Sequence, residues 1–285
     1  MRFENVKLAS ILCIIGNIFL LIIKGIIGLL TKSQAMIADS INSAVDIFSS
    51  LMTFIGNKIA SRPRDDCHNL GHGKAEYIFS MLISIVMMIT SIRVFIDSTT
   101  CVIENKTYIF SIWLIIVCII NIVIKFILYL YTNNISKKHN NLLMKASSKD
   151  NLNDCILTLC NLISCILGIF NIYIFDGIVG IIISIWIIYT SIKIFNESYN
   201  VLMDKSISEE GKNKVIDIIN KYDTIKKINH FNSTPVGYRY QISFTIFVDG
   251  NLSTFESHDI ANRLEKEIIN EIEDIYLVVI HVNPI

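Results

Sequence analysis

The chain has 285 residues, of which 52% are hydrophobic, and its mean hydropathy is +0.53. This composition excludes an ordinary soluble domain, because the apolar residues gather in blocks of roughly 20, the length that crosses a bilayer. The 25 basic and 25 acidic residues give a net charge of zero, so bulk electrostatics predicts no nucleic-acid partner.

The apolar blocks predict six transmembrane helices, at residues 8–30, 34–59, 76–102, 108–132, 148–172 and 177–197. The first block is too long for a removed signal peptide and lacks the small-residue cleavage pattern. Basic residues gather in the N-terminal tail and in the second and fourth connections: Arg2, Lys7, Arg62, Arg64, Lys74, Lys137, Lys138 and Lys145. The positive-inside rule therefore predicts a multi-pass protein of the cell membrane with cytoplasmic N- and C-termini.

The composition changes at about residue 205, where charged residues become frequent and the apolar runs shorten. We therefore expect a six-helix transmembrane domain over 1–204 and a small cytoplasmic α+β domain over 205–285. Periodicity predicts a helix after Ser208, strands at 225–231 and 238–248, a helix through Ile260 and Ile268, and a last strand at 276–282. The order αββαβ is typical of a small open sandwich, which is too small for a large core, and we expect self-association to stabilise it.

The seven cysteines form no CxxC pair, so the sequence supports neither a disulfide framework nor a thiolate zinc site. Most lie in apolar blocks, where they are expected to pack inertly, and Cys67 alone lies near other types of metal ligand. The cysteines are Cys13, Cys67, Cys101, Cys118, Cys155, Cys160 and Cys165.

Two four-residue steps inside apolar helices carry the chemistry. Asn42 and Asp46 lie in the second helix, and Asp150 and Asp154 in the fifth. Residues i and i+4 share a helix face, so each step presents two oxygen-bearing side chains one above the other. Acids in a membrane helix persist when they are paired, protonated or bound to a cation, and they indicate an ion or proton pathway. The structural alternative is that they only cap or hydrogen-bond neighbouring helices.

These four side chains form a hard ligand set, with oxygen donors and neither nitrogen nor sulfur. Such a set suits Mg, Ca, Mn and to a degree Fe(II), whereas a zinc site would usually recruit His or Cys. Without a metal, carboxylates held together away from water bind protons, which an arriving metal displaces. The residues therefore predict a proton-coupled cation exchanger that rocks around a central site.

Three further basic residues, Lys24, Arg93 and Lys125, lie in or near the apolar blocks. Long side chains close to a helix end extend to the lipid headgroups. We expect these three to do so and to take no part in transport.

The stretch from Ser33 to Asp46, SQAMIADSINSAVD, resembles the second-helix motif of the cation diffusion facilitators, and Asp150 and Asp154 match the ligand step of that family's fifth helix. The resemblance covers the whole chain. It implies a six-helix divalent-metal/proton antiporter with a cytoplasmic C-terminal domain, usually a homodimer. Zinc-transporting members typically carry His on the fifth helix, whereas an Asn-Asp-Asp-Asp set is similar to that of bacterial manganese exporters.

The resemblance also implies roles for residues outside the two steps. Asp39 matches the extra acid of the second-helix motif, as an ion access group, a ligand or a proton carrier, with helix packing as the alternative. Lys74 and Asp204 match an ion pair near the dimer interface of the family, with solvated surface charge as the alternative.

Two further metal sites follow from the resemblance. Asp65, His68 and His72 in the second connection match a trio that can hold a second metal, and solvated loop histidines are the alternative. His230, His258 and His281 match a cytoplasmic metal site of zinc-type members. That pattern is depleted here, because Ser243 and Asn283 stand where such members carry a further His and an acid.

Our leading hypothesis is an exporter of Mn(II), with Fe(II) as a further candidate substrate, in which protons are the counter-ion and no cofactor is needed. The nearest alternative is a zinc or iron exporter of the same family, with Zn(II) or Fe(II) as substrate. Alternatives of another class are a membrane-embedded metalloenzyme and a metal sensor. The sequence has neither HExxH nor GxSxG, which weighs against the enzyme. Residues 205–285 contain no recognisable effector domain, which weighs against the sensor.

Overall fold

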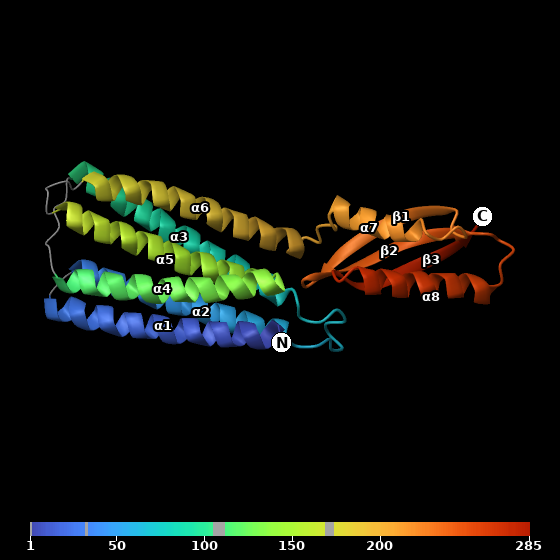
Figure 1. Cartoon of the computed structure of the whole chain (residues 1–285), viewed down its shortest axis with the longest axis horizontal. Coiled ribbons are helices and arrows are strands. Elements are labelled where there is room, and N and C mark those ends of the chain that lie inside the picture. The colour runs from blue at the N-terminus through green and yellow to red at the C-terminus, as the bar shows by residue number, and fades with distance from the viewer. Residues whose placement is uncertain (1, 32–33, 105–111, 169–173) are drawn as a thin grey trace. The chain divides into compact units, whose positions relative to one another are not determined.

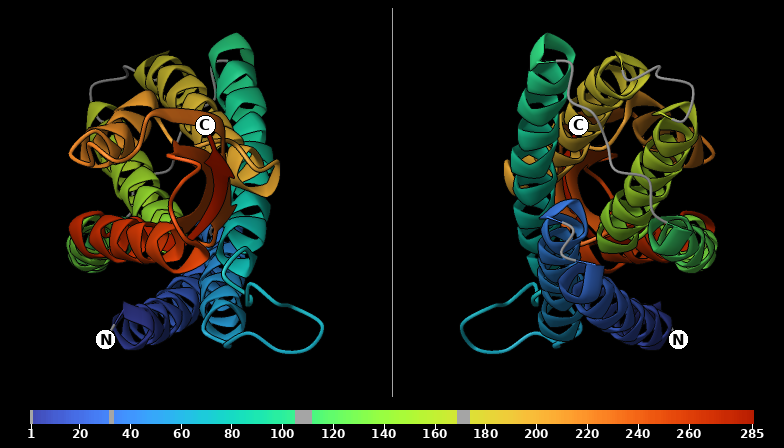
Figure 2. Two further views of the ribbon diagram at one scale, coloured as in Figure 1. Left: turned by 90° about the vertical axis from the view of Figure 1, so that its right-hand side faces the viewer. Right: turned by 90° about the vertical axis from the view of Figure 1, so that its left-hand side faces the viewer.

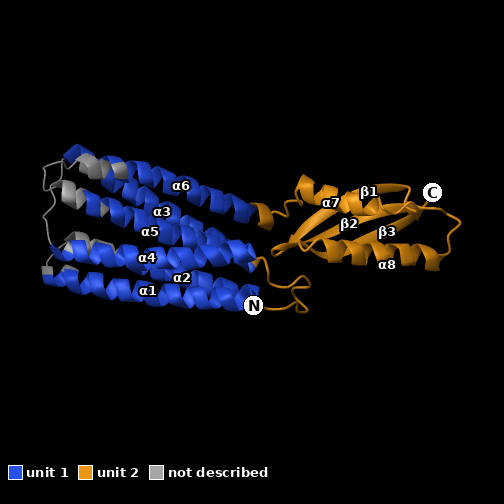
Figure 3. Ribbon diagram, viewed as in Figure 1, with its two compact units in different colours: residues 1–61, 75–199 blue, residues 62–74, 200–285 orange. Residues whose placement is uncertain are grey.

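The computed structural model describes residues 2–31, 34–104, 112–168 and 174–285; within these ranges, several side chains, including those of Asp39 and Asn42, lie outside the description. The chain separates into two compact units, Met1–Ser61 with Ala75–Tyr199 and Arg62–Lys74 with Asn200–Ile285 (Figure 3). The connection between the second and third helices thus belongs to the same unit as the C-terminal residues.

Six long helices lie side by side in the first unit, as predicted (Figure 1). Helix α2 packs against α1, α3 and α5, and α5 also packs against α3 and α4. The end-on views show α2 next to α1 (Figure 2). The bounds are α1 Arg2–Thr31, α2 Gln34–Ala60, α3 Ala75–Glu104, α4 Ile112–His139, α5 Leu142–Gly168 and α6 Ile174–Leu202.

The helices differ in how apolar they are. Over the described residues, α1, α3, α4 and α6 contain stretches long and apolar enough to cross a membrane. These helices carry exposed aliphatic side chains such as Ile22, Ile89, Ile127 and Ile182. Helices α2 and α5 bury many hydroxyl and amide side chains, and α2 also buries Asp46, so the mean hydropathy of both helices is lower. Apolar outside and polar inside is the pattern of a bundle whose solvent is lipid.

A buried ion pair holds one end of the bundle together. The Arg2 guanidinium lies 2.7 Å from Glu76 Oε2, and the other carboxylate oxygen of Glu76 accepts the backbone N–H of Leu142 at 2.7 Å. Arg2 also donates to the carbonyl of His139. Because these residues begin α1, α3 and α5 and end α4, one carboxylate fixes the ends of four helices and satisfies an otherwise unpaired N–H of α5.

The second unit contains a three-stranded sheet and two helices in the predicted order αββαβ. Strand β2 is central, antiparallel to β1 and parallel to β3. Alternating residues Ile242, Phe244 and Ile246 of β2 are buried against α7 and α8. The bounds are α7 Glu209–Ile219, β1 Lys227–Val236, β2 Arg239–Val248, α8 Thr254–Glu271 and β3 Ile275–Pro284.

Serine caps explain where the two short helices begin. Ser208 accepts the N–H of Gly211 at the start of α7, where the sequence predicts a helix start. Ser253 accepts the N–H of Glu256, whose side chain in turn accepts the Ser253 N–H, a complete capping box at the start of α8.

Helices α2 and α3 approach closely at Gly56, where an added Cβ would lie 2.7 Å from the Cβ of Phe79. We expect Gly56→Ala to lower the free energy of unfolding by about 1–3 kcal/mol, the usual cost of overpacking. Thermal unfolding in detergent, followed by tryptophan fluorescence, measures the change.

Gly25→Ala is the matched control, because a Cβ on Gly25 of α1 meets nothing within 4 Å. This substitution should leave the melting temperature unchanged or raise it slightly, since alanine favours the helix. Equal melting temperatures for both variants would contradict the close packing of α2 on α3.

Candidate functional site

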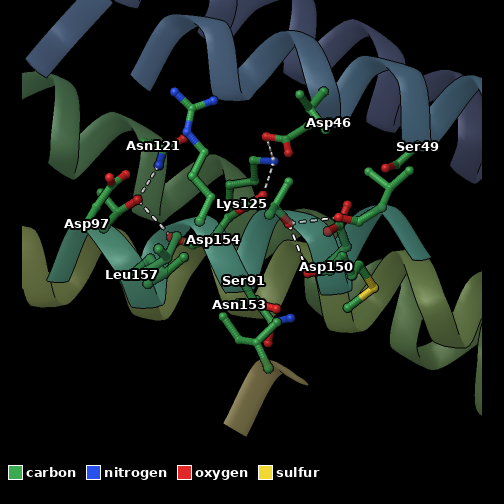
Figure 4. A pocket seen from close by; sticks show the side chains of 18 of the residues that line it. Asp46, Ser49, Ser91, Asp97, Asn121, Lys125, Asp150, Asn153, Asp154 and Leu157 are labelled. Atoms are coloured by element: carbon green, nitrogen blue, oxygen red, sulfur yellow. Dashed lines mark hydrogen bonds and ion pairs between the residues drawn. The ribbon is translucent and has the colours of Figure 1, made fainter. Parts of the chain in front are cut away.

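A cavity of about 440 Å³ lies within the helix bundle of the first unit (Figure 4). Its lining mixes apolar side chains with an unusual density of charged and polar ones. The polar lining residues are Lys24, Asp46, Ser49, Thr90, Ser91, Arg93, Asp97, Asn121, Lys125, Asp150, Asn153, Asp154 and Thr158.

Three of the predicted site acids, Asp46, Asp150 and Asp154, meet at this cavity. Asp46 lies 14 residues before the end of α2 at Ala60, about 21 Å at 1.5 Å per residue. Asp154 lies 12 residues after the start of α5, about 18 Å from that end. The four-residue steps therefore place carboxylates from two packed helices at similar depth, as the helical spacing predicts.

The other two predicted residues of the second helix, Asp39 and Asn42, fall within α2, and their side chains lie outside the described part of the structure. Asn42 precedes Asp46 by one turn, so its Cα lies on the same face of α2. Its service as a fourth oxygen ligand stays a prediction.

Lys125 of α4 lies between the two ligand helices. Its ammonium donates to Asp46 Oδ2 at 2.8 Å and to Asp154 Oδ2 at 2.6 Å, and the residue is 1% exposed. The prediction that this side chain extends to the headgroups is wrong. Lys125 stands 14 residues from the C-terminal end of α4, which is too far for a lysine to span.

Lys24 also departs from that prediction. It is buried, and its ammonium donates to Ser43 at 3.1 Å. Arg93 is exposed and lines the cavity, one turn from Asp97 on α3. Cations therefore surround the acids from α1, α3 and α4, a feature that the sequence reading did not find.

Amide and hydroxyl groups complete the polar lining. Asn121 Nδ2 donates to the Thr158 hydroxyl, which itself donates to the carbonyl of Asp154. Asn121 Oδ1 and both polar atoms of Asn153 are buried and have no hydrogen-bond partner among the described residues. Unpaired buried amides are costly, so these two side chains are available to a ligand, a water or a moving side chain.

A second group of candidate metal ligands lies in the connection 62–74 of the other unit. His68 Nδ1 is 3.0 Å from Asp65 Oδ1, and His72 Nε2 is 3.5 Å from Asp65 Oδ2. One ligand atom from each of the three residues lies within 4.8 Å of the other two. In the described ranges, this is the one such cluster of three His, Cys, Asp or Glu residues.

Backbone contacts hold this cluster in place. His72 Nδ1 donates to the carbonyl of Pro63, which leaves Nε2 as the free nitrogen facing Asp65. The N–H of His68 holds the pKa of the Asp65 carboxyl below its usual range, aided by the His68 and His72 side chains. Asp65 therefore remains an ionised ligand in mildly acidic solution.

Two glycines allow the backbone path that this connection takes. Gly71 has a φ of 77°, a conformation that glycine adopts readily. An added Cβ on Gly73 would lie 2.9 Å from the Cα of Gly237, in the turn between β1 and β2. The loop that carries the cluster thus packs directly on the sheet of its own unit.

The three histidines of the C-terminal domain do not form such a cluster. All are exposed: His230 at an irregularity of β1 with a φ of 52°, His258 on α8 beside Asn262, and His281 on β3. No cluster of three ligand residues within the described part of the chain includes them. A metal site at these histidines stays a prediction.

Lys74 and Asp204 form the predicted ion pair within one chain, with 2.6 Å between Nζ and Oδ1. Both side chains are partly exposed, 37% and 54%. Exposed pairs of this kind contribute at most about 1 kcal/mol. A role at a dimer interface stays a prediction.

Comparison with known proteins assigns nearly the whole chain to a family. The family model of the cation efflux transmembrane domain matches residues 10–203, and that of the cation efflux protein cytoplasmic domain matches residues 207–285. The manganese efflux system protein MneP of Bacillus subtilis is 28% identical over 282 residues, 96% of this chain and 95% of that protein.

Two further relatives align over nearly the full length. MneS, a manganese efflux system protein of B. subtilis, is 27% identical over 95% of this chain and 94% of its own. Magnetosome protein MamB of Magnetospira sp. is 23% identical over 92% of this chain and 89% of its own length. The two family models together cover nearly all residues, so the chain belongs to the cation efflux family of multi-pass membrane transporters, the cation diffusion facilitators that its second and fifth helices resemble.

Proposed function

We propose that this protein exports Mn(II) from the cytoplasm in exchange for protons, with Fe(II) as a further substrate. The observation that carries the proposal is the meeting of Asp46, Asp150 and Asp154 at one cavity inside the bundle. Acids at this depth are retained where a cation or protons bind them. Membership of a family of cation efflux proteins supplies the direction of transport.

Ligand type favours manganese. Carboxylate oxygens, with Asn42 as the fourth donor, form a hard set that suits Mn(II) better than Zn(II). Within the described lining of the cavity there is neither histidine nor cysteine. Two relatives that align over nearly the whole chain are named as manganese efflux proteins. A zinc exporter of the same family is the nearest alternative.

Proton exchange follows from the same carboxylates. When the metal leaves, the negative charge in the apolar bundle that no cation balances attracts protons, and the next metal displaces them. We propose that the protein is a homodimer in the cell membrane, with both termini cytoplasmic. The basic residues of the N-terminal tail and of the second and fourth connections support this orientation.

Single substitutions Asp46→Asn, Asp150→Asn and Asp154→Asn should each lower Mn(II) flux by about tenfold or more, because each removes one charged ligand. The measurement is Mn(II) uptake into proteoliposomes with an imposed pH gradient. The control is Glu197→Gln, since Glu197 pairs with Lys145 in the same bundle and does not line the cavity. Undiminished flux in the triple Asp→Asn variant would overturn the proposed site.

Exchanging Asp150→His should shift preference from Mn(II) toward Zn(II), because imidazole is a softer donor than carboxylate. Competition of Zn(II) with Mn(II) flux in the same liposomes measures the shift. If the ratio of the two inhibition constants stays that of the wild type, selectivity resides elsewhere in the chain.

The loop cluster is proposed as a second metal site. Asp65→Asn or His72→Ala should lower the number of Zn(II) ions bound per chain by one, because each removes a ligand of a three-residue site. Equilibrium dialysis of the full-length protein with metal analysis gives this number. Asp66→Asn is the matched control, an acid of the same loop outside the cluster. Equal stoichiometry in all four proteins would show that the loop holds no metal.

A further inference from the structure

Lys125 occupies the position between the transport acids that a metal would need. Its ammonium is within hydrogen-bond distance of carboxylates from both ligand helices, 2.8 Å from Asp46 and 2.6 Å from Asp154. Figure 4 shows the side chain reaching from α4 toward both acids. The nearest oxygens of two ligands thus already share one cation, supplied by the protein.

The acids are also too far apart to hold a small cation together. A small divalent metal ion binds its oxygen ligands at about 2.0–2.2 Å, so any two oxygens bound to the same ion lie within about 4.4 Å of each other. Asp46, Asp150 and Asp154 do not form a cluster with all ligand atoms within 4.8 Å, although all three are described. Metal binding therefore requires the carboxylates to close up on the space that the ammonium fills.

The cavity offers the ammonium another place. Asn121 precedes Lys125 by one turn on α4, and side chains on a helix lean toward its N-terminus. Asn121 Oδ1 and Asn153 Oδ1 are buried acceptors without a partner among the described residues, and both side chains line the same cavity. If the Lys125 ammonium leaves the carboxylates, it can therefore donate hydrogen bonds to these amide oxygens, so it is not left without acceptors.

We propose that Lys125 is a tethered counter-cation that alternates with the transported metal: it bridges Asp46 and Asp154 when the metal has left and withdraws toward Asn121 and Asn153 when the metal binds. This inference rests on the proposed transport site. Competition from the ammonium lowers the affinity for the metal and speeds its release. It also prevents two buried carboxylates from facing each other without a cation.

The test compares Mn(II) dissociation constants and transport kinetics of purified full-length variants. Lys125→Met removes the competitor and a repelling charge, so Kd should fall by about tenfold or more, with a lower KM and a lower kcat. Lys125→Arg keeps the charge and holds carboxylates in a bidentate grip, so Kd should stay equal or rise. A purely structural lysine predicts weaker binding in both variants.

Asn121→Leu provides an independent measurement where Lys125→Met does not fold. It removes the acceptor that receives the ammonium, so Kd for Mn(II) should rise several-fold while the acids stay intact. The control is Lys145→Gln, which breaks a lysine–carboxylate pair of the same bundle outside the cavity and should leave Kd unchanged.

The outcomes separate the two proposals. A wild-type protein that neither binds nor transports Mn(II) would overturn the proposed function. If the wild-type protein transports Mn(II) but Lys125→Met binds Mn(II) no more tightly than the wild type, only the counter-cation proposal is overturned. An unchanged Kd for Mn(II) in Asn121→Leu would overturn the same proposal.

Discussion

The constraint on which the first unit depends is the cost of burying carboxylates among apolar helices. Asp46 is 6% exposed, and it stands about 21 Å from the end of its helix. An isolated charge at such a place is unstable by several kcal/mol, so the surroundings must supply opposite charge or hydrogen bonds. The structure supplies both: an ammonium from α4, and hydroxyl and amide groups from α3, α4 and α5. The need to surround the acids with polar groups explains why α2 and α5 are polar. Because these two helices are polar, the more apolar helices of the bundle must face the lipid.

Much of this arrangement could be predicted from the sequence. Hydrophobic blocks gave six helices, alternation gave the strands of the second unit, and the four-residue steps brought Asp46, Asp150 and Asp154 to one cavity. These features depend on local periodicity, which a single chain displays in full. The clustering of Asp65, His68 and His72 is likewise local, since all three lie on one short loop.

Lys125 shows where such reasoning fails. The apolar block at 108–132 suggested that this lysine lies close to a helix end, within reach of the headgroups. Helix α4 instead continues through polar residues to His139, so Lys125 is at its middle. An error of seven residues in one boundary therefore led to a wrong prediction of where this side chain lies. The orphaned amides of Asn121 and Asn153 were missed for a related reason, because hydrogen-bond partners across helices depend on packing that periodicity does not specify.

The two proposed metal sites differ in chemistry in the way that their proposed tasks require. The loop cluster contains two imidazoles, and backbone groups fix its orientation through Pro63 and His68, which suits a site that retains its ion. The cavity presents carboxylates together with cations that the protein itself supplies. When ionised, Asp46, Asp150, Asp154 and Lys125 sum to a charge of −2, which a single divalent cation neutralises. The other charged lining residues, Lys24, Arg93 and Asp97, add +1 to this sum. A site with three unopposed acids would bind the metal more tightly and release it more slowly. For a transporter, turnover depends on release as well as capture, so a ligand set weakened by its own lysine is better matched to carrying an ion than to storing one.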